Sequence, residues 1–558
     1  MQADLLRSDA RLPDLLEAAL AAARSYLQAA TNEVEGRVSE NGSLVPALAD
    51  RHQRALHGLA WAACLVETLA ATREWVLDRI ERGRFDETDS LAVRIGFGEY
   101  LAQLVHGIVM SQAEIARPAD LGVEKAAAVL AADAAVRTLM RDGNTAVNRA
   151  ALVAALDNGG IPDSDLGDET NDIIRAQFRR FARDKIAPNA HRWHLADELI
   201  PDEIISEMAS MGTFGICIDP EYGGLGLSKL VMCIVTEELS RAWITAGSLG
   251  TRSEIAGDLI ISSGTEAQKQ TWLPRIASGE VLPTAVFTEP NTGSDLASIS
   301  TRASRDAQGW KITGNKTWIT HAARSDLMAI MARTEPGELG YKGLSIFLAS
   351  KPRRKGSDDF PLPGLTGTEI PVLGYRGMKE YELSFDGFQL PPDSVLGGET
   401  GAGFRQLMRT FEGARIQTAA RAVGVSFNAL ELGLRYAKER QQFGRPIIAF
   451  PRVADKLALI YVETVLAREL TYAAARAKDE GARCDIEAGM AKLLAARTAW
   501  SSADCALQIH GGNGYALEYD ISRVLCDARI LNVFEGAGEI QAHVIGRGLI
   551  VRSANRQR

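Results

Sequence analysis

The chain lacks several features that mark common classes of protein. It has only six cysteines in 558 residues and no CxxC pair, so neither a disulfide framework nor a zinc or redox pair is indicated. No GxGxxG, GxxxxGK[ST], HExxH or GxSxG motif occurs, which argues against a Rossmann or P-loop nucleotide site, a zinc peptidase and a serine hydrolase. No dense group of His, Cys and carboxylate residues predicts a metal site.

Positive charge and long apolar runs are also scarce. The net charge of −9 argues against a nucleic-acid partner, because phosphate backbones are bound by clustered Lys and Arg. The first residues, "MQADLLRSDARLPDLLEAAL", contain early acids and do not resemble a signal peptide. No run approaches the roughly 18 apolar residues that a membrane span needs, so no membrane insertion is expected. We therefore expect a cytoplasmic protein of three or four domains.

Composition and periodicity divide the chain into four regions of a mainly α protein with a central β domain. Residues 1–160 are rich in Ala and Leu and predict a helical extension, which a polar, turn-rich linker near 157–171 separates from the remainder. Residues 165–283 predict a helical domain, 284–395 an antiparallel β domain, and 396–558 a C-terminal helical bundle. One helical stretch of the extension places its apolar residues on a single face: Trp61, Leu65, Leu69, Val76 and Ile80.

Two stretches of the β region suggest a binding surface. "VFTEPNTGSDLASISTRA" (286–303) predicts a strand that runs into a turn rich in N–H donors and hydroxyls. In "GWKITGNKTWIT" (309–320), strand alternation predicts that Trp318 and Thr320 face the same side. An aromatic face beside a hydroxyl suits a flat ring with a polar edge, and an ordinary half-buried hairpin would show the same pattern.

Glu535 stands between Phe534 and Gly536, directly after an apolar run. Surface glutamates usually have polar neighbours, so this carboxylate is predicted to point into apolar surroundings. Burial raises a carboxyl pKa and makes such a group a plausible base.

Five motifs together resemble those of the acyl-CoA dehydrogenase family. They are "FTEPNTGSD", "GNKTWIT", "ERQQFGRPI", "QIHGGNGY" and "FEGAGEIQ", in the order in which that family has them, and the resemblance covers about 165–558. It implies a helical domain, a β barrel and a C-terminal helical bundle in a homodimer or homotetramer. It also implies FAD bound without a Rossmann motif, an acyl-CoA substrate, and an electron-transfer flavoprotein as the electron acceptor.

The resemblance assigns residues to the two parts of FAD. Phe287 and Thr288 resemble contacts to the pyrimidine edge of the flavin, Trp318 the residue beside the ring, and Thr320 the hydroxyl donor to flavin N5. Contacts to the diphosphate and adenosine half are implied for a further group: Arg440, Gln442, Phe443, Gln508, Gly511 and Gly512.

The resemblance also makes Glu535 the base that removes the α proton of the thioester. Some members carry the base just before the arginine of "FEGARIQ", but that position here is Ala414. Gly536 is expected to let the substrate approach, while Ser294 and Arg415 resemble substrate contacts. Residues 537–539 (Ala, Gly and Glu) depart from the family pattern, in which many members have Thr and Gln-like polar residues there.

The length of the extension makes the chain similar to members that oxidise a short branched dicarboxylic thioester, (2S)-methylsuccinyl-CoA, to mesaconyl-CoA in the ethylmalonyl-CoA route of acetate assimilation. A buried substrate carboxylate needs a charged or hydrogen-bonding partner. "SLGTRSEIAG" offers Thr251 and Arg252, although Arg252 fits a structural ion pair equally well.

Other functions stay open at this point. The substrate fits butyryl-, isobutyryl-, isovaleryl- or glutaryl-CoA as well, and the motifs do not separate a dehydrogenase from a flavin acyl-CoA oxidase. A catalytically idle scaffold is a third reading, which the combination of Glu535, Trp318, Thr320 and Arg440 argues against.

Overall fold

The computed structural model describes residues 11–162, 166–335, 337–338, 340–353 and 358–556. The chain folds into two compact units, of which the first combines residues 1–173 with 418–558 and the second comprises 174–417. The predicted fold class, mainly helical with a central β domain, is confirmed. Part of the predicted linker, 163–165, lies outside the described residues. The four domain boundaries proposed from the sequence stay a prediction.

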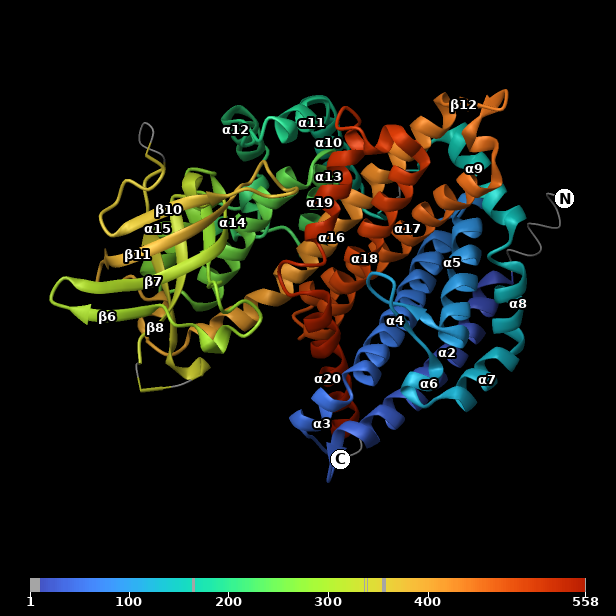
Figure 1. Ribbon diagram of the computed structural model, residues 1–558, viewed down its shortest axis with the longest axis horizontal. Helices are drawn as coiled ribbons and strands as arrows, with labels where there is room; N and C mark the ends of the chain where they lie inside the picture. The colour runs from blue at the N-terminus through green and yellow to red at the C-terminus, as the bar shows by residue number, and fades with distance from the viewer. Residues whose placement is uncertain (1–10, 163–165, 336, 339, 354–357, 557–558) are drawn as a thin grey trace. The chain divides into compact units, whose positions relative to one another are not determined.

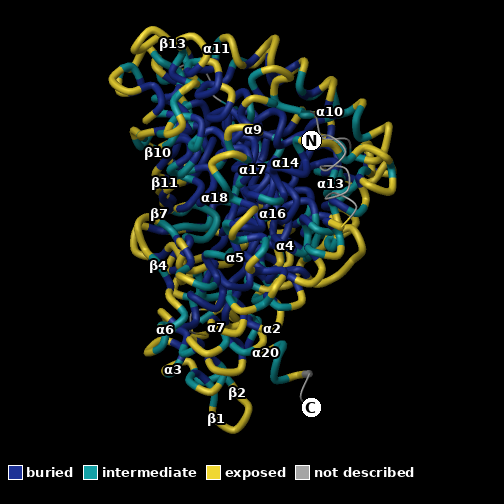
Figure 2. The backbone as a smooth tube through the Cα atoms, turned by 90° about the vertical axis from the view of Figure 1, so that its right-hand side faces the viewer, coloured by how far each residue is buried: buried dark blue, intermediate teal, exposed yellow. Residues whose placement is uncertain are grey.

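In the first unit, helices of the N-terminal extension pack on helices from the end of the chain. Figure 1 shows the blue extension helices beside the orange and red C-terminal ones. The main members are α2 (Leu12–Val38), α4 (Gln53–Glu81), α5 (Glu87–His106), α17 (Pro451–Asp479), α18 (Asp485–His510), α19 (Asp520–Ile530) and α20 (Gly538–Arg556). Figure 2 shows the buried, dark blue backbone around α17. The extension therefore shares one hydrophobic core with the C-terminal helices.

Helix α4 lies at the centre of this shared core. It is long and apolar enough to cross a membrane by length and composition, so the expectation that no run approaches that size is wrong. Its most apolar 18-residue stretch is 78% buried in the folded chain, where α4 contacts α2, α17 and α20. Four of the five predicted stripe residues are buried, whereas Ile80 near the helix end is exposed. Burial of this kind is expected of a core helix.

Local signals in the sequence set the start of α5. Asp86 caps the helix by accepting a hydrogen bond from the backbone N–H of Asp89, and the Asp89 side chain accepts one from Asp86 in return. Such a reciprocal capping box satisfies N–H groups that a helix start leaves without partners. Arg79 at the end of α4 donates to the same Asp89 carboxylate at 2.7 Å, which links the two helices through a buried ion pair.

The second unit combines helices with one seven-stranded sheet. Its helices include α11 (Ala187–Leu195), α12 (Asp202–Ser210), α13 (Lys229–Ala242), α14 (Ile244–Ser263) and α15 (Glu266–Ala277). The strands are β5 (Pro283–Val286), β6 (Arg302–Asp306), β7 (Gly309–Thr320), β8 (Leu327–Arg333), β9 (Leu344–Ser350), β10 (Leu365–Ile370) and β11 (Glu380–Leu390). Their order is β10-β11-β7-β6-β8-β5, with β9 also on β8.

The pairing in this sheet is antiparallel except along β8, which pairs in parallel with β5 and β6. The fully antiparallel domain expected from the sequence is therefore corrected at that strand. Two apolar cores form around the sheet, one of them including residues of α14 and α15. Helix α16 (Gly403–Glu439) contributes to both units of the chain.

Candidate active site

A buried ion pair fixes the loop that follows β5 in the second unit. The Glu289 carboxylate accepts hydrogen bonds from the backbone N–H groups of Ser300 (2.8 Å) and Thr301 (2.9 Å), and from Lys316 Nζ (3.0 Å). Lys316 Nζ also donates to the backbone oxygen of Phe287 at 2.8 Å. Burial alone raises the pKa of Glu289, but the Lys316 charge and these donors lower it to about 2. The loop at Phe287 is thereby locked to β7.

A β-bulge interrupts β7 at Trp318, two residues before Thr320. The register with β11 shifts between Lys316 and Ile319, and Trp318 has a φ of 57°. Trp318 is 56% exposed, whereas Thr320 is only 6% exposed. A bulge interrupts the period of two, so strand alternation alone does not fix the direction of the two side chains, and their placement on one surface stays a prediction. Trp318 thus offers an exposed aromatic ring, whereas Thr320 is buried.

Thr320 bonds a buried carboxylate that the sequence analysis missed. Thr320 Oγ1 donates to Glu380 Oε1 at 2.8 Å, and Glu380 is 8% exposed. Burial raises the pKa of Glu380 to about 7, against opposite effects of the Thr320 hydrogen bond and the Arg252 charge. A glutamate at the start of a strand gives no sequence signal of this kind, because its cross-strand partner depends on the register.

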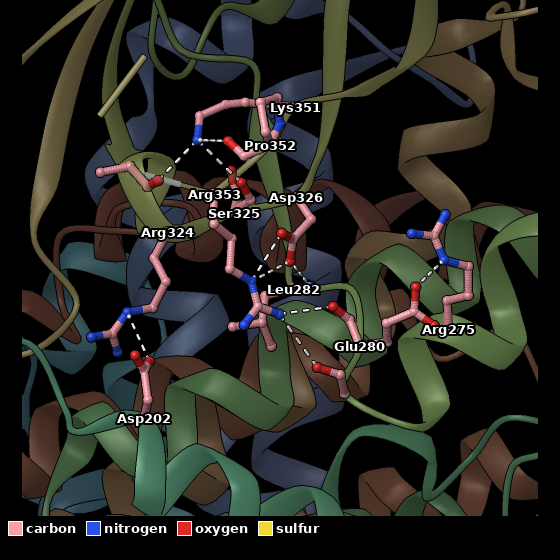
Figure 3. A network of polar contacts seen from close by, with 12 residues as sticks. Asp202, Arg275, Glu280, Leu282, Arg324, Ser325, Asp326, Lys351, Pro352 and Arg353 are labelled. Atoms are coloured by element: carbon pink, nitrogen blue, oxygen red, sulfur yellow. Dashed lines mark hydrogen bonds and ion pairs between the residues drawn. The ribbon is translucent and has the colours of Figure 1, made fainter. Parts of the chain in front are cut away.

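A polar network holds the turn that follows Thr320. Figure 3 shows Lys351 directed at backbone oxygens of this turn, and its Nζ donates to Ala323 O (2.8 Å) and Ser325 O (3.2 Å). Nearby, Arg353 Nε lies 2.8 Å from Asp326 Oδ2. Burial lowers the pKa of Lys351 to about 8. These contacts keep the end of β7, and with it Thr320, in a defined position.

The residues proposed for the acyl pocket of the second unit lie on α14, on the loop after β5 and on α16. Thr251 on α14 is fully buried, and its hydroxyl donates to Gly247 O of the same helix at 3.0 Å. Arg252 is partly exposed, and its charge lowers the pKa values of Glu380 and His321. Ser294 is exposed in its loop, and Arg415 on α16 lies 5.8 Å from the Phe411 ring. Their roles as substrate contacts stay predictions.

Glu535 in the first unit occupies a strained turn between α19 and α20. Its φ is 53°, a left-handed conformation that costs a non-glycine residue about 1–3 kcal/mol. Gln541 Nε2 donates to the backbone oxygen of Glu535 at 3.2 Å, and buried Lys492 Nζ donates to that of Gly536 at 2.6 Å. The turn is thus held from α18 and α20, and its conformation directs the Glu535 side chain.

The Glu535 carboxylate is paired with a buried arginine of α16. Arg421 Nη2 lies 2.8 Å from Glu535 Oε2 and 2.8 Å from Thr418 Oγ1, and the Thr418 hydroxyl also bonds Glu535. Arg421 is fully buried, with its guanidinium 4.8 Å from the Phe534 ring centroid, while Glu535 is 14% exposed. The prediction of purely apolar surroundings is wrong, because α16 brings a cation and a hydroxyl to the carboxylate. A cationic partner favours the ionised form, the form that can accept a proton.

Arg421 and Thr418, like Glu380, are site residues that the sequence did not predict. A usable signal was present for Arg421, because it interrupts the apolar helical stretch "TAARAVGV". An arginine on a buried helix face requires an anionic partner. The sequence does not show which carboxylate supplies it, since Arg421 and Glu535 are 114 residues apart.

The residues proposed for the diphosphate half of FAD are all exposed in the first unit: Arg440, Gln442, Phe443, Gln508, Gly511 and Gly512. The structure places their two segments near each other through the stacked rings of Tyr436 and His510, 4.2 Å apart. Asn513 Nδ2 also donates to the Tyr436 hydroxyl at 2.9 Å. Exposed donors and an exposed Phe443 ring suit a ligand, and their roles stay predictions.

Comparison with known proteins identifies the class. Models of the acyl-CoA dehydrogenase N-terminal, middle and C-terminal domains match residues 168–280, 284–388 and 401–550. The chain belongs to the acyl-CoA dehydrogenase family, as its five motifs predicted, and it is an oxidoreductase acting on CH–CH bonds of acyl-CoA.

Three similar proteins carry further information. The chain is 56% identical over 535 residues to the (2S)-methylsuccinyl-CoA dehydrogenase of Cereibacter sphaeroides, across 95% of this chain and 97% of that protein. A glutaryl-CoA dehydrogenase from Mycobacterium smegmatis in complex with FADH2 matches with a TM-score of 0.62 and 28% identity, over 68% of this chain and 95% of its own. A structure described as the electron transferring flavoprotein of Acidaminococcus fermentans has a TM-score of 0.65 and 31% identity, over 70% and 99%.

Proposed function

We propose that this chain is a FAD-dependent dehydrogenase that converts (2S)-methylsuccinyl-CoA to mesaconyl-CoA and passes electrons to an electron-transfer flavoprotein. The substrate is supported by the 56% identity to a (2S)-methylsuccinyl-CoA dehydrogenase along almost the whole chain, extension included. The FADH2 of the glutaryl-CoA dehydrogenase structure supports the cofactor. The exposed indole of Trp318, two residues before Thr320 in β7, fits a planar ring.

The contact between Arg421 and Glu535 carries the substrate proposal. In methylsuccinyl-CoA the α carbon bears a methyl group, and the neighbouring β carbon bears a carboxylate. A base that reaches the α proton therefore comes close to a second negative charge, and two carboxylates in one buried site repel each other strongly. The positive charge of the fully buried guanidinium, already in contact with Glu535, offsets that repulsion from behind the base.

Glu535 and its neighbours have separate roles in the proposed reaction. Glu535 accepts the α proton, and the electron pair of that C–H bond becomes the new double bond as the β hydrogen leaves as hydride. FAD, when bound, accepts this hydride. Phe534 covers one side of the guanidinium, which limits the access of water to the charged groups. The left-handed turn at Glu535 keeps the carboxylate directed at one place throughout.

The alternatives from the sequence remain outcomes of the test: another short or branched acyl-CoA, or electron transfer to oxygen by an oxidase. A cytoplasmic location and a homodimeric or homotetrameric assembly stay predictions.

The test is anaerobic bleaching of the flavin absorbance of the purified protein by (2S)-methylsuccinyl-CoA, compared with butyryl-, isobutyryl-, isovaleryl- and glutaryl-CoA. Bleaching by methylsuccinyl-CoA alone is the expected result. Bleaching by an uncharged acyl-CoA at an equal rate would overturn the substrate proposal and leave Glu535 as the base. Rapid reoxidation of the reduced protein by oxygen, without an electron-transfer flavoprotein, would identify an oxidase.

A further inference from the structure

The buried pair Thr320 and Glu380 occupies the meeting point of two strands. Thr320 is the last residue of β7, Glu380 is the first of β11, and the two are direct register partners. The backbone oxygen of Thr320 accepts a hydrogen bond from Thr284 Oγ1 at 2.6 Å, so β5 also fixes this position. The Thr320 hydroxyl is therefore held against the Glu380 carboxylate by backbone pairing as well as by its own 2.8 Å bond.

The hydrogen bond between the two side chains depends on which of them carries the proton. A threonine hydroxyl has one proton to donate, and an ionised carboxylate can only accept. While Glu380 is ionised, the Thr320 hydroxyl donates its only proton to Glu380 and can act toward any other group only as a hydrogen-bond acceptor. A protonated Glu380 donates to Thr320 Oγ1, which frees the threonine proton. Glu380 Oε2 accepts no hydrogen bond from any described residue, so no other protein donor fixes the protonation state.

We propose that Glu380 is a positioning residue that sets whether the Thr320 hydroxyl donates a hydrogen bond to N5 of bound flavin. This inference rests on the proposed function, because it needs FAD beside Thr320. Oxidised flavin N5 is a hydrogen-bond acceptor, so it is matched by the protonated form of Glu380. Ionisation of Glu380 turns the hydroxyl away from N5 without moving either strand.

Among the titratable groups near Glu380 discussed below, Glu380 is the one expected to change its protonation state near neutral pH. Arg252 on α14 acts on both Glu380 and His321. Burial, together with the charges of Arg324 and Arg252, lowers the pKa of His321 well below its usual value, so this imidazole stays neutral. Lys379, the neighbour of Glu380, is engaged by Glu369 at 2.8 Å. Tyr381, the next residue in β11, is itself buried.

Because the pKa of Glu380 is about 7, the change falls near neutral pH. Below the transition Thr320 donates toward N5, and above it the donor is lost. The absorbance of oxidised flavin responds to a hydrogen bond at N5, so the oxidised holoenzyme should show one spectral transition near pH 7.

The experiment records the visible spectrum of the oxidised, FAD-loaded protein from pH 5 to pH 9. The variants are Glu380→Gln, which cannot ionise, and Thr320→Val, which keeps a titratable Glu380 but has no hydroxyl. Glu369→Gln is the matched control, since it removes a carboxylate near the same strand end without touching Thr320. Thr320→Ser keeps the hydroxyl, and thermal unfolding of each variant reports whether it folds.

The expected result is a transition in the wild type, Thr320→Ser and Glu369→Gln, and its loss in Glu380→Gln and Thr320→Val. Retention of the transition in Thr320→Val would overturn the inference, because Glu380 would then act on the flavin directly. No transition in the wild type would also overturn it.

The midpoint potential gives a second readout that does not depend on turnover. The difference between wild type and Glu380→Gln should be small at pH 5 and grow above pH 7, whereas a purely structural effect would be the same at every pH. Failure of the protein to bind FAD would contradict the proposed function. If FAD binds, but neither its spectrum nor the difference in midpoint potential between wild type and Glu380→Gln changes with pH, only this inference is contradicted.

Discussion

Arg421 Nη2 lies 2.8 Å from Glu535 Oε2, and the arginine is fully buried while the glutamate keeps 14% of its side chain exposed. The cation thus stands behind the carboxylate, and the accessible part of the pair belongs to the base. This arrangement places a positive charge behind the base, and the same charge acts on a second anion near it.

The first prediction concerns substrate charge. Arg421→Gln should lower kcat/KM for (2S)-methylsuccinyl-CoA by about 10²–10³-fold, because the repulsion between Glu535 and the substrate carboxylate is then no longer offset, and a buried charge interaction of this kind is worth about 2–5 kcal/mol. For isobutyryl-CoA, which has the α methyl group but no carboxylate, the loss should stay within about tenfold. Steady-state kinetics with both thioesters measures the difference.

Arg252→Gln is the companion variant, because Arg252 was the arginine proposed from the sequence. An equal loss with both substrates in Arg421→Gln would show that Arg421 serves Glu535 alone. If only Arg252→Gln lost the preference for (2S)-methylsuccinyl-CoA over isobutyryl-CoA, Arg252 would be the residue that recognises the substrate carboxylate.

The second prediction concerns the base. Glu535→Gln keeps the shape of the side chain but cannot accept the α proton, so turnover should fall by about 10²–10⁴-fold. The flavin spectrum should stay that of the wild type. Glu412→Gln is the matched control, since Glu412 is also a buried acid and lies two residues before the alternative base position Ala414. Loss of activity in Glu412→Gln, with turnover retained in Glu535→Gln, would move the base to α16.

Much of the architecture could be predicted because it depends on local patterns. The helical extension, the β region and the C-terminal helices follow from periodicity and turn residues, and five short motifs were enough to identify the family. The bulge at Trp318 could not be predicted in this way, because an extra residue in a strand leaves the alternating pattern intact in the sequence. Strand alternation therefore does not fix the relative direction of Trp318 and Thr320.

The partners of the site residues could not be predicted for a different reason. Arg421 meets Glu535, and Thr320 meets Glu380, through helix packing and strand register between segments 114 and 60 residues apart. A sequence shows that a buried charge needs a partner, but tertiary packing selects it. The packing of α4, a helix of the extension, on the C-terminal helices is likewise set by tertiary structure and not by a local pattern.

The third prediction concerns the turn after the base. Gly536 has a φ of 91°, and an added Cβ would lie 2.1 Å from Gln541 Nε2. Gly536→Ala should lower the free energy of unfolding by about 1–3 kcal/mol, because an alanine is strained in that conformation. Gly512→Ala is the control, since open space surrounds that position and its φ is not left-handed. Denaturant unfolding of both variants checks this, and equal stability would show that the turn relaxes freely.

The fourth prediction concerns acid stability. The pKa of Glu289 is about 2 in the folded chain, below its usual 4.5, so its ionisation stabilises the fold above pH 4.5 and this stabilisation is lost as the pH falls toward 2. Between pH 5 and pH 3 the wild type should lose about 2 kcal/mol more than Glu289→Gln.

Unfolding monitored at several pH values in this range measures the difference. Glu280→Gln, which removes an exposed partner of Arg275, should follow the wild type because exposed pairs contribute little. A Glu289→Gln variant that is as acid-sensitive as the wild type would contradict the assignment.

The last prediction concerns the extension. If residues 1–160 only added stability, the remaining chain would keep its kinetics after their removal. The structure predicts otherwise, because α4 and α5 cover apolar side chains of the C-terminal helices; an added Cβ at Gly96 would lie only 2.7 Å from Leu466 Cδ2. A chain of 161–558 should therefore aggregate, since it exposes a large apolar face. Co-expression with a separate 1–160 chain should restore a soluble, flavin-loaded protein, as gel filtration and absorbance would show. A monodisperse 161–558 protein with unchanged kcat and KM would mean that the C-terminal helices close their core without the extension.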